Sequence, residues 1–518
     1  MNQEFFSRRG LFLAGASALS SALITARAQA DPRRMCFADD PFTLGVASGD
    51  PDSQSVVIWT KLAPKPLEPD GGMAPNAAAE VQWEVFEDEA QTRPVKSGKV
   101  KTGRTIGHSV HIEVDGLQPD RWYWYRFHAG DATSPVGRTR TLPAGDARPE
   151  RLRFGVASCQ HFETGYFTAY RQMAADNPDL VFHVGDYIYE GSGRDGSARK
   201  HEAPRLQTIA DYRIRYSQYR TDPDLQKMHA LCPWFVTWDD HEVENNYAND
   251  ISQILDMDPA QFLLQRAAAY QAYWEIMPLR RSSIPKGPDM QLYRKASYGR
   301  LAELFILDTR QYRTDQPNGD KSAPLNEAAL NPKNTIMGAA QKRWLMDGMR
   351  RSGGRWNLLA QQVMMGMNDI TAGPEKNYSM DQWPGYAHER MELVRFMKDR
   401  RISNPVVVTG DIHSNWVNDL RVDDRELKQP VVATEFVGTS ITSGGNGQDK
   451  PAAHDARLAE NPGCKFYNTQ RGYLRCTVTD KTWQTDYVVM DKVTEQSGTA
   501  SVRASFVVEA GKAGVQTA

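Results

Sequence analysis

The stretch FHVGDYIYEG, residues 182–191, begins inside an apolar run and ends in a series of polar and aromatic side chains. The run over residues 180–184 predicts a buried strand that ends at Gly185. Asp186 follows directly, and Tyr189 comes three residues later. Open α/β sheets bind their ligands at the carboxyl ends of the strands. This stretch therefore predicts a functional site at the end of a buried strand.

Three further predicted strands end in residues of the same kind. These segments are FGVASCQ (154–160) with Cys159, FVTWDDHEVENN (235–246) with Asp240 and His241, and VVVTGDIHSNW (406–416) with Asp411 and His413. Each feature taken singly has a structural alternative: a buried thiol, a helix-capping Asp, a wall tyrosine, a solvated polar turn. Four strand ends, in order along the chain, that all carry metal-ligand chemistry favour a polynuclear metal centre.

The ligand types indicate two kinds of metal ion. The two carboxylate oxygens of Asp186 can bridge a pair of cations that lie ~3.5–4 Å apart. The phenolate of Tyr189 and the thiolate of Cys159 favour a ferric ion over magnesium alone. Asp240 and Asp411 suit a hard divalent ion such as calcium, magnesium or manganese. His413 follows Asp411 closely enough to turn toward the same centre.

His241 has a different predicted role. It comes directly after Asp240, at the mouth of the predicted site, where it is better placed to protonate a leaving group than to complete a metal sphere. His183 lies inside a predicted strand, and we expect it to be a core histidine. His108, His111, His128 and His454 belong to no comparable group.

The composition argues against a disordered protein and against a nucleic-acid-binding protein. The chain has 518 residues, of which 40% are hydrophobic and 24% charged, with a net charge of -2. These values are typical of a globular protein with two or three domains and give no indication of a nucleic-acid-binding surface.

Residues 1–30 are predicted to be an export signal. Arg8 and Arg9 precede a moderately apolar run, and residues 28–30 (AQA) have the small-x-small form of a cleavage site. Paired arginines favour the twin-arginine export machinery as a partner, with an ordinary secretory signal as the alternative. The run is shorter than the ~20 apolar residues of a membrane span. We therefore expect a periplasmic or secreted protein with no stable membrane anchor after cleavage.

The five cysteines give one further expectation. They are Cys36, Cys159, Cys232, Cys464 and Cys476. An odd number in an exported protein leaves at least one thiol unpaired, and Cys159 is the candidate. Cys464 and Cys476 are close in sequence and form the expected pair, although the sequence leaves the connectivity open.

The pattern along the chain predicts two domains after the signal. Residues 40–143 contain short β-rich runs separated by turns, which predict a fibronectin-like β-sandwich. A polar linker covers 141–150. Residues 151–518 alternate strands with helices, as in an α/β domain, with helices expected at 164–177, 262–277, 339–352 and 386–399.

In these segments the chain resembles the PhoD-type alkaline phosphatases and, more distantly, purple acid phosphatases and other calcineurin-like metallophosphoesterases. The resemblance is carried by PFTLGVASGDP, ASCQHFETGYFTAY, HVGDYIYEG, TWDDHEVENNYA, ILDTRQYR, LLAQQVMM and TGDIHSNW, and by the twin-arginine leader. It implies a four-layer αββα metallophosphoesterase domain behind the sandwich.

The resemblance also implies a cofactor set of Fe³⁺ and Ca²⁺, with two calcium ions. Cys159, Asp186, Tyr189 and His413 then fall on the ferric side, whereas Asp186, Asp240 and Asp411 fall toward calcium. Asp239 and Asn246 are weaker candidates for a further ion. Arg310 is the candidate for contacting phosphate oxygens through its bidentate fork, with a structural ion pair as the alternative.

The expected function is that of an exported phosphoesterase. A metal-activated hydroxide would release phosphate from phosphomonoesters and phosphodiesters, while His241 protonates the leaving group. The first alternative is a phospholipase D-like phosphodiesterase that uses the same site. The second is a non-catalytic surface-binding protein in which the sandwich is the active part.

Overall fold

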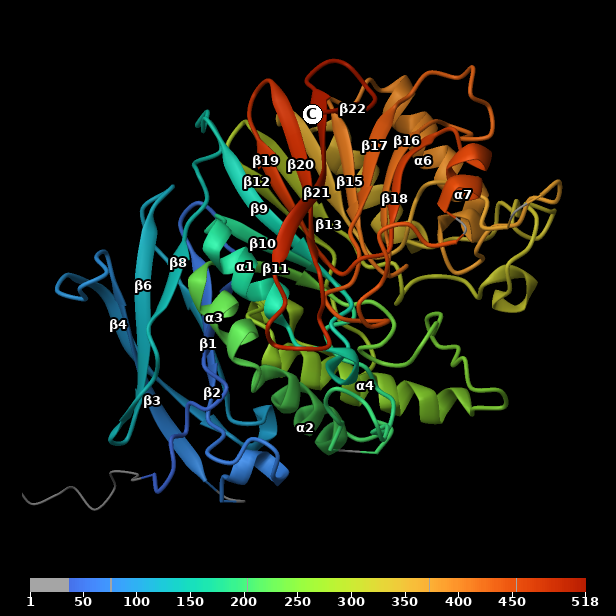
Figure 1. Ribbon diagram of the computed structural model, residues 1–518. Coiled ribbons are helices and arrows are strands. Elements are labelled where there is room, and N and C mark those ends of the chain that lie inside the picture. Colours follow the sequence, from blue (N-terminus) through green and yellow to red (C-terminus); the bar gives the residue numbers. More distant parts are fainter. Residues whose placement is uncertain (1–36, 75–76, 203, 372, 453) are drawn as a thin grey trace, which may run out of the picture.

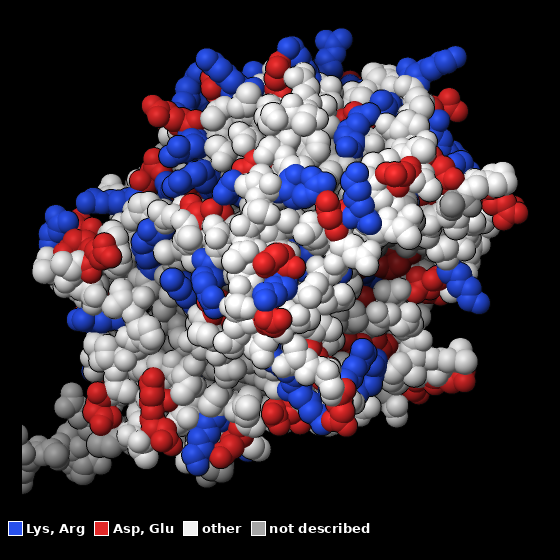
Figure 2. Space-filling model, in the orientation of Figure 1, with Lys and Arg blue, Asp and Glu red and all other residues white. Residues whose placement is uncertain are grey.

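The computed structural model describes residues 37–518, apart from residues 75–76, 203, 372 and 453. The expected export signal at 1–30 and Cys36 lie outside the described residues. Within the described part of the chain, no helix combines the length and the apolar character that a membrane span requires. Lys and Arg side chains are interspersed with Asp and Glu over the face drawn in Figure 2.

The first sheet contains ten strands in the order β22-β21-β20-β19-β9-β10-β11-β1-β2-β5. Their bounds, in that order, are Gln516–Thr517, Ala500–Glu509, Thr482–Met490, Gly472–Val478, Leu152–Ala157, Leu180–Val184, Trp234–Thr237, Val46–Gly49, Val56–Lys61 and Ser109–Val114. The central strands β9, β10 and β11 are parallel. Their carboxyl ends therefore meet at one edge of the sheet.

The second sheet contains seven strands in the order β12-β13-β14-β15-β17-β16-β18. Their bounds, in that order, are Arg294–Tyr298, Ala302–Ile306, Trp356–Ala360, Pro405–Thr409, Ala433–Val437, Asn415–Leu420 and Cys464–Asn468. Strands β13, β14, β15 and β17 are parallel to one another. This second parallel core brings further strand ends to the region of the site.

Seven α-helices are present in the described residues. They are α1 Thr168–Asp176, α2 Ile209–Arg220, α3 Pro223–Leu231, α4 Pro259–Ile276, α5 Gly338–Arg350, α6 Ala387–Asp399 and α7 His454–Glu460. The expected helices at 164–177, 262–277, 339–352 and 386–399 correspond to α1, α4, α5 and α6. The sequence analysis did not predict α2 and α3.

Three apolar layers hold the α/β part together. Phe182 on β10 packs with Leu304 and Val408 of the second sheet, which fills the space between the sheets. On the outer face of the first sheet, Val181 packs with side chains of α1 to α4. On the outer face of the second sheet, Val407 packs with α5 and α6. The fold is thus the expected four-layer αββα arrangement, and Figure 1 shows its helices on both sides.

The N-terminal part forms the expected β-sandwich. One half of the sandwich is a separate, third sheet with the order β4-β3-β6-β7 and with β8 paired to β6. The bounds of β4, β3, β6, β7 and β8 are Pro94–Gly103, Ala78–Phe86, Trp122–Ala129, Ala132–Thr133 and Gly137–Arg140. The apolar core of the sandwich lies between this sheet and strands β1, β2 and β5, and includes Ile58, Val81 and Tyr125.

Strands β1, β2 and β5 are buried on both faces. Gly49 on β1 pairs with Trp234 on β11, so that these strands continue the first sheet of the α/β part. Trp59, on the face of β2 turned away from the sandwich core, belongs to the cluster under α1 to α4. Its Nε1 donates a hydrogen bond of 2.9 Å to the carbonyl of Glu275 on α4. The N-terminal strands therefore form part of the sheet surface against which helices α1 to α4 pack.

Two expectations about single residues have clear outcomes. His183 is buried and stacks on Trp234, with 6.1 Å between the ring centroids, which confirms it as a core histidine. The expected Cys464–Cys476 disulfide is wrong, because both cysteines are free, buried thiols. Cys464 lies on β18 in the second sheet and Cys476 on β19 in the first, so their closeness in sequence does not carry over into space.

Candidate metal centre

The side chains predicted as metal ligands come from strand ends of both sheets. Cys159 lies two residues after β9, Asp186 two residues after β10, and Asp240 three residues after β11. Asp411 and His413 follow β15 in the second sheet. Both parallel cores direct their carboxyl ends to one region of the fold. Residues that are far apart in the sequence therefore meet there, as expected for ligands bound at strand ends.

A first group combines four kinds of donor atom. The ligand atoms of Cys159, Asp186 and His413 lie within 4.8 Å of one another. The hydroxyl of Tyr189 donates to Asp186 Oδ2 at 2.9 Å and lies 3.1 Å from His413 Nε2. A thiol, a carboxyl, a phenol and an imidazole are thus gathered around one point.

A second group consists of carboxyl oxygens. Single oxygens of Asp239, Asp240 and Asp411 lie within 4.8 Å of one another, and an equally tight set joins Asp186 and Asp240 to His241. Asp186 therefore belongs to the first group and also contacts the carboxyl-rich side. Asp186 Oδ1 and Asp239 Oδ2 are buried and lack a hydrogen-bond partner among the described residues.

The backbone that presents these side chains is strained. Cys159, Asp186, Asp411 and His413 have φ values of 58°, 55°, 63° and 52°, in the left-handed region that side chains other than glycine rarely adopt. Such conformations cost ~1–3 kcal/mol each and cluster at functional sites. A side chain in place of Gly185 would also collide with Asp239. The turns after β9, β10 and β15 are therefore shaped for the site at a cost in stability.

The electrostatics of the carboxyl groups indicate that a cation belongs here. Burial, and then the charge of Asp240, raises the pKa of Asp186 well above its usual range. Burial, and then the charge of Asp381, raises the pKa of Asp411 to about 6. Burial raises the pKa of Asp239 as well. Mutual repulsion of buried carboxylates is relieved by a bound metal ion.

Asp240 differs from its neighbours. Burial alone would raise the pKa of this carboxyl, but the charges of Arg310 and His241 hold that pKa below its usual range. On the other side, burial and the charge of Asp186 raise the pKa values of the Cys159 thiol and the Tyr189 phenol. Both groups would ionise only with a cation beside them. The donor set therefore fits a high-charge cation near Cys159 and harder divalent cations near the aspartates.

His241 lies at the mouth of the site and is held by a second carboxylate. Its Nδ1 lies 2.7 Å from Oε2 of Glu190, and the His241 side chain is 18% exposed. Burial alone would lower the pKa of the imidazole, but the charges of Asp240 and Glu190 raise it well above its usual range. With Nδ1 engaged, the free Nε2 is the nitrogen available to an incoming group.

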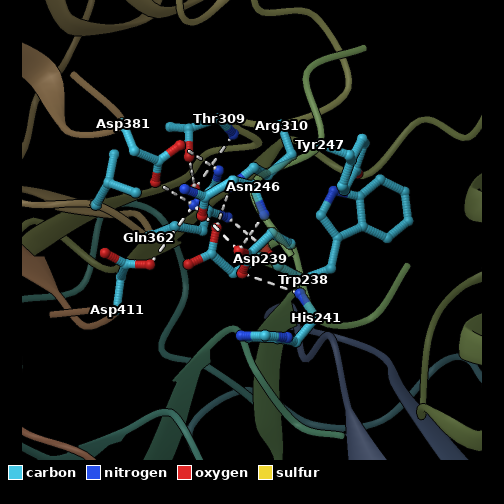
Figure 3. Close-up of polar contacts among 12 residues, drawn as sticks. Trp238, Asp239, His241, Asn246, Tyr247, Thr309, Arg310, Gln362, Asp381 and Asp411 are labelled. Atoms are coloured by element: carbon cyan, nitrogen blue, oxygen red, sulfur yellow. Dashed lines mark hydrogen bonds and ion pairs between the residues drawn. The ribbon is translucent and has the colours of Figure 1, made fainter. Parts of the chain in front are cut away.

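Arg310 lies inside the protein and not at its surface. Its guanidinium donates to Asp239 Oδ1 at 2.5 Å and, in bidentate fashion, to both oxygens of Asp381 at 2.7 and 2.8 Å. One nitrogen also lies 3.5 Å from Asp411, and the side chain has no exposed area. Figure 3 shows Arg310 among these aspartates, with His241 set apart. This is the geometry of the ion-pair alternative, and the phosphate contact remains a prediction.

Asn246, the weaker candidate for a further ion, contacts the same carboxylates through its backbone. Its N–H donates to Asp240 Oδ2 at 2.7 Å, while its side-chain amide donates to Asp320 at 2.6 Å. The side chain of Asn246 is thus engaged outside the group formed by Asp239, Asp240 and Asp411.

Sequence reasoning missed several residues that hold the site in shape. Glu190 orients His241, Asp381 pairs with Arg310, and Ser443 Oγ lies 2.7 Å from the hydroxyl of Tyr189. Glu242 accepts hydrogen bonds from the backbone N–H groups of residues 186, 187 and 239, and so ties the loop after β10 to the loop after β11. Glu242 was visible in DDHEVE, but no pattern distinguished it from a solvated turn.

An αββα fold whose strand ends gather carboxyl, thiol, phenol and imidazole groups defines the metallophosphoesterase class. The family model described as PhoD-like phosphatase matches residues 154–487, and the model described as PhoD-like phosphatase, N-terminal domain, matches residues 26–143. The chain therefore belongs to the PhoD-like phosphatase family and is an enzyme of the alkaline phosphatase type.

Individual relatives agree with this assignment. The chain is 49% identical over 485 residues to alkaline phosphatase D of Bacillus subtilis (strain 168), covering 93% of this chain and 83% of the relative. A solved structure titled "Structure of PhoD" superposes with a TM-score of 0.90 at 49% identity, covering 93% of each chain. Purple acid phosphatase 23 of Arabidopsis thaliana is 32% identical over 100 residues, covering 17% of this chain and 20% of the relative.

Proposed function

We propose that this phosphatase is a metal-dependent hydrolase of phosphomonoesters and phosphodiesters. The observation that carries the proposal is the position of Asp186, whose carboxyl belongs to the group with Cys159 and His413 and also to the group with Asp240. A carboxylate shared in this way suits a bridge between two metal ions. Bound metal ions would supply charge neutralisation at phosphate and a water of lowered pKa.

The two groups support different ions. Cys159, Asp186, Tyr189 and His413 would hold Fe³⁺, since thiolate and phenolate ligands suit a trivalent ion. The neighbouring aspartates, Asp186, Asp240 and Asp411, would hold Ca²⁺, because they offer hard oxygen ligands only. Two calcium ions are proposed, in keeping with the number of carboxyl oxygens near the second group. The two unpartnered buried oxygens, Asp186 Oδ1 and Asp239 Oδ2, support cation binding at both places.

His241 would serve as the general acid. Glu190 fixes Nδ1, so that Nε2 carries the proton that passes to the leaving oxygen as the ester bond breaks. The negative charges of Asp240 and Glu190 stabilise the protonated form of the His241 imidazole. An imidazole that is 18% exposed can meet leaving groups of different size.

Arg310 would act as a positioning residue. Its guanidinium binds Asp239 and Asp381 and lies 3.5 Å from Asp411. A fixed positive charge at this point keeps the carboxyl oxygens separated and oriented before any ion binds. A phosphate contact by Arg310 would require these ion pairs to break.

The proposal also covers the organisation and location of the protein. Residues 1–30 would be a twin-arginine signal that is removed on export to the periplasm or the exterior. Residues 40–143 would be the sandwich unit, and residues 151–518 the catalytic unit. The alternative of a non-catalytic surface-binding protein is not retained, because membership of the family makes the chain an enzyme.

The test combines metal analysis with a panel of esters. Purified mature protein is analysed for iron and calcium, then assayed on a phosphomonoester, a simple phosphodiester and phosphatidylcholine. We expect both metals and hydrolysis of the first two substrates. Asp186→Ala should lose metal and all hydrolysis, whereas the matched control Asp195→Ala, at a side chain that is 94% exposed, should change neither. Full activity of metal-free protein would refute the proposal, and preference for phosphatidylcholine would favour the phospholipase D-like alternative.

A further inference from the structure

His161 lies beside the candidate metal centre, in the loop that follows Cys159. It caps the short 3₁₀-helix η3, Phe162–Thr164, and its Nδ1 accepts a hydrogen bond of 3.2 Å from the backbone N–H of Glu163. A neutral imidazole has one acceptor nitrogen and one donor nitrogen. Since Nδ1 is the acceptor, Nε2 carries the hydrogen. The cap therefore fixes which nitrogen of His161 can donate.

The ring of His161 is held against a predicted metal ligand. Its centroid lies 4.3 Å from that of Tyr189, and the ring of His241 lies 4.2 Å from the same tyrosine. The Tyr189 hydroxyl in turn contacts Asp186 and His413. Both histidines therefore border one aromatic side chain that reaches into the centre of the site.

The backbone of His161 is fixed from the far end of the chain. Its N–H donates to Ser443 Oγ at 3.2 Å, and its carbonyl accepts from Thr442 Oγ1 at 2.8 Å. The loop that carries Thr442 and Ser443 is also tied to Cys159, because Ser443 Oγ lies 2.7 Å from the Cys159 carbonyl. A donor on a backbone clamped at both sides is preorganised for a ligand.

A phosphate ester at this centre needs hydrogen-bond donors for its oxygens, and three arginines around it, Arg310, Arg471 and Arg205, are engaged with other partners. Arg310 is buried in its ion pairs with aspartates. Arg471 is buried, and its guanidinium donates to carbonyl groups of the site loops, including that of His413. Arg205 pairs with Glu190 and Glu244.

His161 Nε2, by contrast, has no hydrogen-bond partner in the described part of the chain. This nitrogen is not one of the buried side-chain atoms without a hydrogen-bond partner, so it is accessible to solvent. The side chain as a whole is partly exposed. A preorganised N–H group on a ring beside Tyr189 is thus open to solvent.

We propose that His161 is a substrate-binding residue, whose Nε2–H donates to a non-bridging oxygen of the phosphoryl group. This inference rests on the proposed function and adds a named phosphate contact to it. The contact would serve monoesters and diesters alike, because both retain non-bridging phosphoryl oxygens. It would also hold inorganic phosphate, the product of monoester hydrolysis.

The test is the substitution His161→Asn. Asparagine is a favoured N-cap residue, so it can still accept from Glu163 N–H, but it is too short to place a donor where Nε2 stands. Binding of inorganic phosphate to metal-loaded protein is measured by calorimetry and by competitive inhibition. We expect phosphate affinity to fall about tenfold to a hundredfold, the range for a hydrogen bond to a charged group. Metal content and the unfolding midpoint should stay at wild-type values.

Two comparisons make the result specific. His388→Asn is the matched control, because His388 is an exposed residue of α6, the helix on the outer face of the second sheet, and it should bind phosphate like the wild type. For His161→Asn, hydrolysis should fall by the same factor for nitrophenyl and alkyl phosphates, since a phosphoryl contact does not depend on the leaving group.

The opposing outcomes are equally distinct. Unchanged phosphate affinity in His161→Asn would overturn the inference, and so would loss of metal or a loss confined to poor leaving groups. If wild-type protein hydrolyses no ester, the proposed function fails. The calorimetric comparison of phosphate binding would then still decide the role of His161.

Discussion

Replacement of Arg310 by glutamine should destabilise the protein far more than an ordinary surface substitution. The guanidinium has no exposed area and binds Asp239 at 2.5 Å and Asp381 at 2.7 Å. Arg313 also binds Asp381 at 2.7 Å, so that carboxylate keeps one cation in the variant. Asp239 has no other cation among its ion pairs in the described residues. The chief cost is therefore one buried carboxylate left uncompensated.

The size of this cost follows from the burial. Removing one partner of a buried ion pair costs about 3–5 kcal/mol, because the remaining charge stays in a medium of low polarity. We expect Arg310→Gln to lose about that much free energy of unfolding. Arg310→Lys should lose less, since lysine keeps the charge but cannot form the bidentate pair with Asp381. Metal affinity should also fall in both variants, because Asp239 and Asp411 lose their fixed neighbour.

The assay is urea unfolding of chelator-treated protein, so that no bound cation replaces the guanidinium, with phosphate affinity measured on metal-loaded samples of the same variants. Arg395→Gln is the control, because Arg395 is an exposed residue of α6. The control should unfold within ~0.5 kcal/mol of the wild type. The reasoning is refuted if Arg310→Gln unfolds like the control while its phosphate affinity drops. That result would instead establish Arg310 as a phosphate contact.

Three other outcomes are expected. His241→Ala should lose ~10²–10⁴-fold in the hydrolysis of esters with poor leaving groups and less with nitrophenyl esters, while metal content stays near wild type; loss of metal would make His241 a ligand. Cys159→Ser should selectively weaken the iron site, seen as lost iron and a lost visible charge-transfer band; an iron-free, colourless and fully active wild type would contradict this. Arg8→Lys combined with Arg9→Lys should block export and leave folded enzyme in the cytoplasm, by cell fractionation; normal export would indicate the general secretory route.

The sequence predicted the parts of the site that directly follow apolar strands. Cys159, Asp186, Asp240 and Asp411 each come within three residues of a strand end, and the apolar run before each one is visible in the sequence. Parallel strands bring such ends together, so their meeting could be expected. The sandwich and the αββα layers could be expected on the same basis, from alternation and from the resemblance.

The supporting residues could not be predicted, because their partners are remote in sequence. Glu190 contacts His241 across 51 positions, and Asp381 contacts Arg310 across 71. No local pattern distinguishes such a carboxylate from a solvated one. The burial of Arg310 was hidden for the same reason, since a local motif does not show how much of the chain covers it.

Two helices were missed although local signals existed. Helix α2 begins with a capping box formed by Thr208 and Asp211, and α3 begins with the N-cap Asp222 before Pro223. Three tyrosines of α2 pack into the core at helical spacing, Tyr212, Tyr216 and Tyr219. Arg213 and Arg215 lie between the first two tyrosines and lower the apolar character of the segment. Capping chemistry would have located both helices better than hydropathy did.

Strands β1, β2 and β5 pack against the sandwich on one face and against the helices on the other. This arrangement limits how the protein can be cut into fragments or recombined with other domains. A fragment beginning at residue 151 would uncover the surface of α4 that binds Trp59, along with the edge of β11. Uncovered apolar faces and free strand edges promote aggregation. The N-terminal strands therefore cannot be swapped like a detachable binding module. Over evolutionary time, the sandwich and the catalytic part must be inherited together, and substitutions on β2 and α4 must stay compatible with each other.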